Sequence, residues 1–179
     1  DIGDYAFAYT AMTEADLSGA VNVGTAAFLK ETLTPFKVTL GENLKTLGDN
    51  PFAMCDVAPF CVVETTEFNG KKIETKIYSY VISDTVQVIN GSLYCQVPNG
   101  LELITYTDLD GKNVKVADGT ARITAMAFAG SDVEMVTLPA TTFSIGHKAF
   151  FDCKELELVM FRSYNAPVLE EAFDPTYYE

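Results

Sequence analysis

The sequence predicts an α/β repeat solenoid, with short strands on one face, short helical turns on the other, and an irregular β-rich insert. Three observations lead to this prediction. Phenylalanines, mostly preceded by alanine, recur at nearly equal intervals. Aliphatic residues and glycines recur at fixed places before them, and a short alternating apolar pattern follows them. Recurrence at a fixed period of about 20–50 residues is typical of stacked-repeat proteins.

The repeat is clearest in residues 122–161, where one pattern occurs twice. We use its phenylalanine as the anchor of each unit. Successive anchors are 21, 24, 76, 22 and 23 residues apart, so only one gap departs from the period. The anchors are Phe7, Phe28, Phe52, Phe128, Phe150 and Phe173. Five residues before them stand Ile2, Val23, Leu47, Ile123, Ile145 and Val168, and four units have glycine next, at Gly3, Gly24, Gly48 and Gly146.

A unit of this length cannot bury its apolar face alone, so it must stack on its neighbours. The aliphatic residue and the anchor can share the inward face of a short helical turn. The glycine is expected to take a backbone conformation that other residues resist. After the anchor, Val136 and Leu138 alternate with Met135 and Thr137 as in a short strand, which Pro139 can end. The equivalent inward positions are Ala15 and Leu17, Val38 and Leu40, and Val159 and Phe161.

One unit, Ile145-Gly146-His147-Lys148-Ala149-Phe150-Phe151-Asp152-Cys153 with Leu156 and Val159, resembles the BspA-type leucine-rich repeat. The resemblance covers roughly residues 1–63 and 120–174. It implies a right-handed leucine-rich-repeat solenoid, with repeats at 1–63 and at 120–179, where the last unit is degenerate. Three places depart from the pattern: Asn50-Pro51-Phe52, Pro35-Phe36, and the final unit, which lacks its glycine.

Residues 64–119, which we call the middle segment, interrupt the period and predict either a β-hairpin-rich insert or degenerate repeats. Asn69-Gly70, Asn90-Gly91 and Asn99-Gly100 are strong hairpin-turn signals. Between them the sequence predicts a hairpin over 65–76 and strands over 86–89, 93–97 and 101–106. The resemblance favours degenerate repeats. Whether the segment stacks in line or projects as a lobe stays open.

Composition limits the classes of function. Hydrophobic residues make up 48% of the 179 residues, as in a folded protein. The net charge of −13 argues against binding to nucleic acid or to anionic lipid, which require a basic face. No apolar run reaches the ~18 residues of a membrane span, so we expect no membrane insertion. The chain begins inside a repeat, so any export signal is expected upstream.

Four cysteines occur, at Cys55, Cys61, Cys95 and Cys153. Cys55 and Cys153 hold equivalent repeat positions, three residues after an anchor, so they occupy separate units and are expected to be buried thiols. A Cys61–Cys95 disulfide stays possible, because sequence alone does not establish the geometry.

No motif predicts catalysis, a cofactor or a metal. The single histidine, His147, holds a variable repeat position and is expected at the surface. Residues 107–113 start like a calcium loop, but Gly119 stands where the bidentate glutamate is needed, so a turn explains them better. Asn90-Gly91-Ser92 is a formal glycosylation sequon that doubles as a turn. The acidic pairs, including Glu170-Glu171, are expected to be solvated faces. The sequence therefore predicts a protein that is not an enzyme.

The candidate binding surface is the outward row of the repeat strands, because stacked strands present their outward residues as a ladder. The ladder changes from charged in the early units to apolar in the late ones. We call its two parts the early row, Glu14, Asp16, Lys37 and Thr39, and the late row, Met135, Thr137, Leu158 and Met160. An exposed late row would suit a protein partner, whereas the middle segment could instead cover it.

The resemblance implies a non-catalytic protein-binding or adhesion module of a secreted or cell-surface bacterial protein. Its expected partner is a host matrix or cell-surface protein, and its expected location is extracellular or at the cell surface. Two alternatives stay open: a structural spacer, and an accessory domain of a larger surface enzyme.

Overall fold

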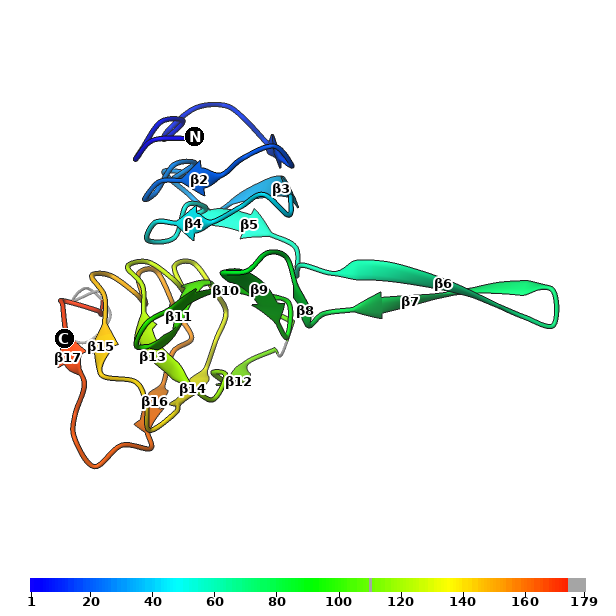
Figure 1. Cartoon of the computed structure of the whole chain (residues 1–179). Helices are drawn as coiled ribbons and strands as arrows, with labels where there is room; N and C mark the ends of the chain where they lie inside the picture. The colour runs from blue at the N-terminus through cyan, green and yellow to red at the C-terminus, as the bar shows by residue number, and fades with distance from the viewer. Residues whose placement is uncertain (110, 174–179) are drawn as a thin grey trace.

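The computed structural model describes residues 1–109 and 111–173. It is a right-handed β-solenoid in two blocks of rungs, with an extended hairpin between them (Figure 1). We call residues 1–60 the first block and residues 100–173 the second block. In Figure 1 the rungs of the first block follow one another downward, and those of the second run from right to left.

The first block contains two parallel sheets. One has the order β1-β3-β5, formed by Glu14–Leu17, Thr34–Leu40 and Cys55–Val57. The other pairs β2 with β4, Asn22–Val23 with Thr46–Leu47. Both sheets are parallel because each rung repeats the path of the previous one.

The second block repeats this plan. Its parallel sheet β12-β14-β16 comprises Asn113–Lys115, Met135–Leu138 and Leu158–Phe161. Opposite it run β11, β13, β15 and β17, which are Gly100–Thr105, Thr120–Ile123, Ser144–Ile145 and Val168–Leu169. In β14, Val136 and Leu138 are fully buried while Met135 and Thr137 are half-buried, which is the predicted alternation.

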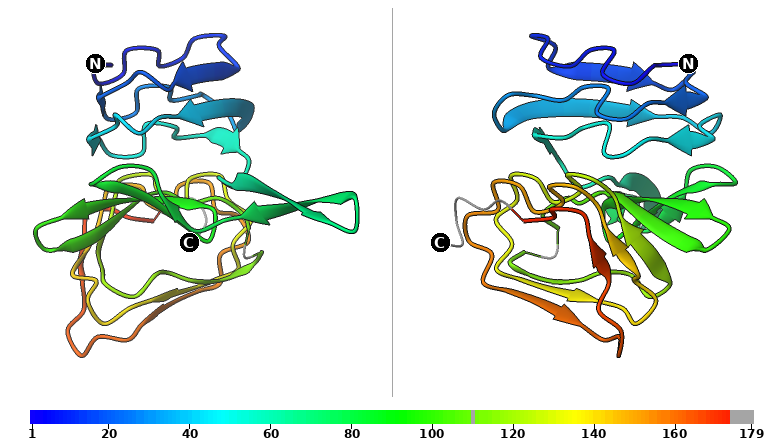
Figure 2. Two further views of the ribbon diagram at one scale, coloured as in Figure 1. Left: turned by 45° about the vertical axis from the view of Figure 1, so that its right-hand side comes forward. Right: turned by 90° about the vertical axis from the view of Figure 1, so that its left-hand side faces the viewer.

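The residues between the two blocks, 61–99, form two parts with different roles. The antiparallel hairpin β6–β7, Val62–Phe68 and Lys71–Ile77, projects from the solenoid and pairs with no other strand among the described residues (Figures 1 and 2). We call it the arm. The strands β8, β9 and β10, which are Tyr80–Val81, Val86–Ile89 and Ser92–Val97, instead extend the β11–β17 sheet of the second block. One part of the segment therefore projects, and the other stacks in line.

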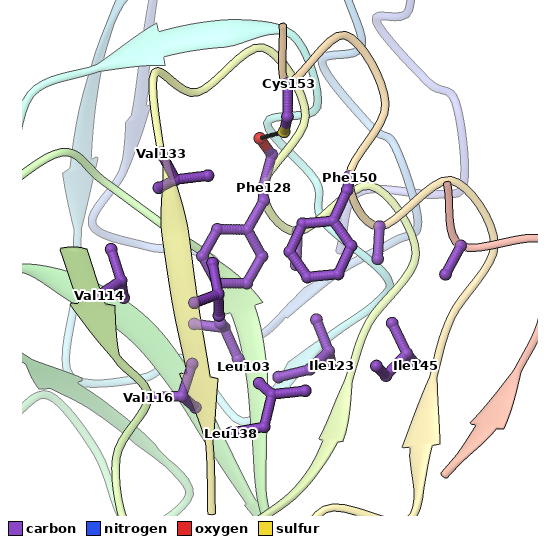
Figure 3. Packing of buried hydrophobic residues seen from close by; sticks show 14 of the residues in the cluster. Leu103, Val114, Val116, Ile123, Phe128, Val133, Leu138, Ile145, Phe150 and Cys153 are labelled. Atoms are coloured by element: carbon purple, nitrogen blue, oxygen red, sulfur yellow. Dashed lines mark hydrogen bonds between the residues drawn. The ribbon is translucent and has the colours of Figure 1, made fainter. Parts of the chain in front are cut away.

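The anchors form two aromatic stacks, one in each block. In the first, the ring centroid of Phe28 lies 5.4 Å from that of Phe7 and 5.7 Å from that of Phe52. In the second, the Phe128 and Phe150 centroids lie 5.0 Å apart, and Figure 3 shows both rings among the buried aliphatics. Tyr106 stacks on Phe128 at 4.7 Å. It is an anchor that the sequence pattern missed.

The predicted short helical turns are wrong, because no helix occurs in the part of the chain that the structure describes. The residues two before and two after an anchor take positive φ in most rungs. Met126 at 56° and Gly130 at 77° flank Phe128, and Lys148 at 52° and Asp152 at 55° flank Phe150. A left-handed residue interrupts a right-handed helix, so each segment is a series of tight turns.

These turns release amides that a helix would use internally. The N–H groups of Met126 and Phe128 donate to the carbonyl oxygens of His147 and Ala149 in the next rung, at 3.1 and 2.8 Å. The amide between them, that of Ala127, bonds within its own rung. Alternate amides therefore link adjacent rungs, which satisfies the backbone and sets the rung spacing.

The recurring glycines serve close approach, and the expectation of an unusual backbone conformation at them is wrong. None of them has positive φ. A Cβ at Gly146 would lie 2.6 Å from the backbone nitrogen of Ala125, and one at Gly48 would lie 2.3 Å from that of Thr25. Gly3, in the first rung, has no atom within 4 Å of such a Cβ. Glycine is therefore needed where a rung lies against the preceding one.

Asn50, one of the departures from the repeat pattern, lies where the two blocks meet. Its side-chain amide donates to the Met126 carbonyl oxygen at 2.6 Å, and its side-chain oxygen accepts from the Thr105 hydroxyl at 2.7 Å. Next to it, the Arg122 guanidinium donates two hydrogen bonds to the Asp49 carboxylate, at 2.8 and 2.9 Å. The irregular unit thus holds the second block against the first.

Candidate binding cleft

The structure places the predicted outward row on two sheets that do not pair with each other. In the early row, Glu14 pairs with Lys37 across β1 and β3, and Asp16 pairs with Thr39. The late row pairs Met135 with Leu158 and Thr137 with Met160 across β14 and β16. The ladder is therefore two separate surfaces, one on each block.

The late row keeps an exposed apolar half. Leu158 and Met160 expose 44% and 45% of their surface. Phe161, which was expected to be an inward residue, pairs with the buried Leu138 but still exposes 37% of its surface. The middle segment does not cover them: its strand β12 lies beside β14, where Asn113 pairs with Met135 and Lys115 with Thr137. The alternative in which the middle segment covers Leu158 and Met160 is therefore wrong.

A cleft of about 1020 Å³ lies beside the early row, between the first block and residues 61–62 and 80–82 of the segment that follows it. Three segments form most of its lining: β3 with the turn that follows, residues 56–62 from within β5 onward, and residues 80–82 around β8; Thr13 adds to it. Lys37 and Thr39 of the early row belong to this lining. The lining is mainly apolar, with Pro35, Phe36, Val57, Pro59, Phe60, Tyr80, Val81 and Ile82.

Two free sheet edges border the cleft. The strand β3 has seven residues, but β5 has three and pairs only with Thr34, Pro35 and Phe36. On that side, the rest of β3 up to Leu40 has no paired strand among the described residues. Across the cleft, β8 is the terminal strand of its seven-stranded sheet. Free edges present backbone donors and acceptors that another strand can satisfy.

The polar groups of the cleft are few. The charged side chains are those of Lys37, Glu42 and Asp56. Burial, and secondarily the nearby Cys61 thiol, raises the pKa of Tyr80, so its phenol keeps its proton and can donate a hydrogen bond. A mainly apolar lining with a few oriented polar groups is typical of binding sites.

The sequence offered an indirect signal for this cleft. Pro35-Phe36 departs from the repeat pattern, and Pro59 stands two residues after the end of β5. Proline lacks an amide donor, so it restricts strand pairing. Because β5 is short, the second half of β3 pairs with β1 on one side and has no paired strand on the β5 side among the described residues. The position of β8 opposite it could not be read from the sequence.

The groups considered for catalysis are dispersed. The His147 ring nitrogen Nδ1 lies 3.5 Å from a Glu171 carboxylate oxygen, and both side chains are exposed. Burial raises the pKa of Asp108, and repulsion from Asp132 and Asp56 adds to this effect. Within residues 1–109 and 111–173, no group of three or more His, Cys, Asp or Glu side chains could hold a metal ion. Asp110 of the turn that resembles a calcium loop, and the predicted end of the last unit at 174–179, lie outside the described residues.

All four cysteines are free, so Cys61 and Cys95 are not bridged. The two equivalent cysteines act alike: the Cys55 thiol donates to the Phe28 carbonyl oxygen at 3.2 Å, and the Cys153 thiol donates to that of Phe128 at 3.0 Å (Figure 3). Burial raises the pKa of Cys55 to about 12 and that of Cys153 to about 11. These thiols link rungs and are poor nucleophiles.

The described residues also contain no helix that is long and apolar enough to cross a membrane.

Three solved structures share the fold. One is a leucine-rich cell surface protein from Faecalibacterium prausnitzii A2-165, with 20% identity and a TM-score of 0.54 over 89% of this chain and 32% of that one. The pneumococcal vaccine antigen PcpA has 19% identity and a TM-score of 0.55 over 90% and 42%. A leucine-rich repeat protein from Eubacterium ventriosum ATCC 27560 has 16% identity and a TM-score of 0.52 over 90% and 45%. The chain thus spans less than half the length of each.

No curated protein matches the sequence. The family model for the BspA-type leucine-rich repeat region, however, matches in six copies over residues 1–109 and 71–177. These matches extend across the middle segment, where Tyr106 stands as an additional anchor. The chain therefore belongs to the BspA-type leucine-rich repeat family.

Proposed function

We propose that this chain is a non-catalytic protein-binding module of a secreted or cell-surface bacterial protein, with a role in adhesion. The observation that carries the proposal is the cleft beside β3. It combines an apolar lining with two free sheet edges. The cleft therefore suits an extended polypeptide better than a compact small molecule, because an added strand satisfies the edges along its length.

The free edge of β3, on the side where β5 has ended, supplies the backbone contacts. The Lys37 amide donates to the Thr13 carbonyl oxygen, on the β1 side, at 2.9 Å. Amides alternate in direction along a strand, so those of Val38 and Leu40 are directed to the opposite side, where β5 has already ended. A partner segment of about four residues could pair there, at ~3.3 Å per residue.

The side chains of the cleft define the partner further. Phe60, Tyr80 and Val81 favour apolar side chains at alternate positions of the bound segment. Two carboxylates, Glu42 and Asp56, outnumber the one lysine of the cleft, and the whole chain carries a net charge of −13. Basic residues beside the apolar ones would therefore speed association. A host matrix or cell-surface protein with such a segment is the proposed partner.

Two of the proteins with a similar structure are a cell surface protein and a vaccine antigen, which supports a surface location for this chain. The late row on the second block is a second proposed contact surface, because Leu158 and Met160 are exposed on the same face of β16. A structural spacer would bind nothing through either surface. An accessory domain would assist catalysis by another part of a longer protein.

Binding can be measured by biolayer interferometry against immobilised fibronectin, fibrinogen, laminin and collagen. We expect saturable binding to at least one of them. The Val81→Glu substitution should weaken it at least about ten-fold, because it places a charge at the cleft. Val168→Glu is the matched control, since Val168 is comparably exposed, 63% against 72%, and lies on β17 in the other block.

Leu158→Glu with Met160→Glu tests the late row in the same assay. A loss with this pair alone would place the contact on the second block and reject the cleft. Absence of binding to all four proteins would reject the adhesion function and favour the spacer.

A further inference from the structure

The arm is the most exposed element of the structure. Every residue of its strands from Val62 to Lys76 is exposed, and only Ile77 is half-buried. Figures 1 and 2 show it extending away from both blocks. An isolated two-stranded hairpin is at best marginally stable in water. A feature of this kind is therefore expected to gain stability from a partner.

The two faces of the arm differ in polarity. Opposite residues of antiparallel strands share a face, so Val62 with Ile77, and Thr66 with Ile73, lie on the same side as Phe68. Phe68 exposes 67% of its surface and Ile73 exposes 47%. The other face bears Val63, Thr65, Glu67, Lys72, Glu74 and Lys76. The first face also bears Glu64, Lys71 and Thr75, but it carries most of the apolar side chains of the arm.

The two edges of the arm differ as well. Strand β7 carries Lys71, Lys72 and Lys76, and lysine on an edge strand discourages pairing with other chains. Strand β6 carries no lysine or proline. The three lysines balance Glu64, Glu67 and Glu74, so the arm is neutral in a chain of net charge −13. It is a place where two copies can meet without strong repulsion.

We propose that β6 pairs antiparallel with β6 of a second copy, about a two-fold axis at Thr65. In this register Thr65 faces its own equivalent, Glu64 faces Thr66, Val63 faces Glu67, and Val62 faces Phe68. All seven residues of the strand are paired and no glutamate faces another. The apolar faces of the two arms form one side of a four-stranded sheet.

The alternative pairings are disfavoured. Full pairing of β7 with β7 of a second copy would place Lys72 opposite Lys76, and Glu74 opposite Glu74. Like charges directly opposite each other destabilise a sheet. Pairing β6 with β7 of another copy would make the arms run in the same direction. The two solenoids would then start about 10 Å apart, the width of two strands, and would collide.

The proposed register has a consequence at the cleft. Val62 belongs to the cleft lining, and Phe68 of the second copy lies opposite it. Phe68, which is exposed at the tip of a free arm, would therefore pack beside Val62 at the base of the other arm. The interface is self-complementary, as two-fold dimers require. The dimer does not depend on the proposed adhesion function.

Sedimentation velocity between about 1 and 100 µM tests the proposal. We expect a monomer–dimer equilibrium that moves to dimer over this range. Thr65→Lys should weaken the dimer at least about ten-fold, because two lysines would then face each other. The matched control is Thr75→Lys on β7. Within the arm, Thr65 pairs with Glu74 and Thr75 pairs with Glu64, so the lysine introduced by either variant has a glutamate directly opposite it. Only the first variant changes the proposed interface.

A cysteine pair gives an independent readout. Thr65→Cys should form a covalent dimer under mild oxidation, seen on a non-reducing gel, because the two-fold axis places both thiols together. Thr75→Cys and the unsubstituted chain, which has its own free cysteines, should not. A monomer at every concentration would overturn the proposal. Equal dimerisation of Thr65→Lys and Thr75→Lys, or equal crosslinking at both positions, would overturn it too.

Discussion

The two blocks share their inward architecture and differ in their outward faces. Each stacks aromatic anchors about one rung apart, and each links rungs through a cysteine thiol and alternate backbone amides. Outward, the first block presents the polar early row beside a cleft, whereas the second presents the apolar Leu158 and Met160. Stacking constrains the inward positions and leaves the outward ones free to differ. Differences in binding between the blocks should therefore come from outward residues alone.

The largest effect is expected at the anchors. Phe28→Ala and Phe128→Ala each remove a ring that is 1% exposed and stacked on both sides. Each should lower the free energy of unfolding by about 3–5 kcal/mol, through lost burial and a new cavity. Urea unfolding followed by circular dichroism measures it. A much smaller loss in one block would show that the two cores are not equivalent.

The next largest effect is expected at Asn50, where the two blocks meet. Asn50→Ala leaves the Met126 carbonyl and the Thr105 hydroxyl without their partner in a buried place, which should cost about 2–3 kcal/mol. The single unfolding transition should then separate into two, one for each block. Asn22→Ala is the control: its side chain also makes two hydrogen bonds, to Asp1 and from the Thr46 hydroxyl, but both are exposed to water, so its effect should be below about 0.5 kcal/mol. One sharp transition in Asn50→Ala would mean that other contacts unite the blocks.

Substitutions of the recurring glycines distinguish two reasons for a glycine: close approach of neighbouring rungs, and an unusual backbone conformation. Gly146→Ala places a Cβ 2.6 Å from the Ala125 nitrogen, so the rungs must shift, at a cost of about 2 kcal/mol. Gly3→Ala meets open space and should be neutral. Thermal unfolding of both variants checks the difference. Equal destabilisation would indicate that these glycines are needed for their conformation after all.

The smallest effect concerns the equivalent thiols. The pKa of Cys153, about 11 in the folded chain, lies above the ~8.5 of an unfolded thiol. Its contribution to stability is therefore complete below pH ~8.5 and is lost as the pH rises toward 11. Between pH 7 and pH 9.5 the loss should be about 1 kcal/mol. Cys153→Ala should lose less stability over that interval, and an unchanged pH dependence would contradict this account of Cys153.

Much of the fold could be predicted because stacking repeats the same inward residues. The aliphatic position, the anchor and the strand alternation around Val136 and Leu138 all follow from burial, which recurs with the period. The turn conformation could not be predicted, because Met126 and Lys148 take positive φ against their own preference. Hydrogen bonds to the next rung hold them there, and those depend on the stacked structure. Tyr106 was missed because the pattern was anchored on phenylalanine, and Thr105 stands where most units have alanine.

The candidate site was less predictable than the fold. The register of the repeats located the outward row. Its division into two surfaces could not be predicted, because outward residues do not recur with the period. The cleft depends on where β5 ends and on which strand lies opposite. Pro59 hinted at the first, whereas the second depends on how residues 80–97 join the second block. Such contacts between segments distant in sequence leave no local signal.

Hydrogen–deuterium exchange tests the central claim most directly, with the chain free and bound to the matrix protein that it binds most tightly. We predict slower exchange in the complex at the amides of Val38 and Leu40 and over residues 80–82, with β14 and β16 unchanged. Protection confined to β14 and β16, or protection nowhere, would contradict the assignment of binding to the cleft of the first block.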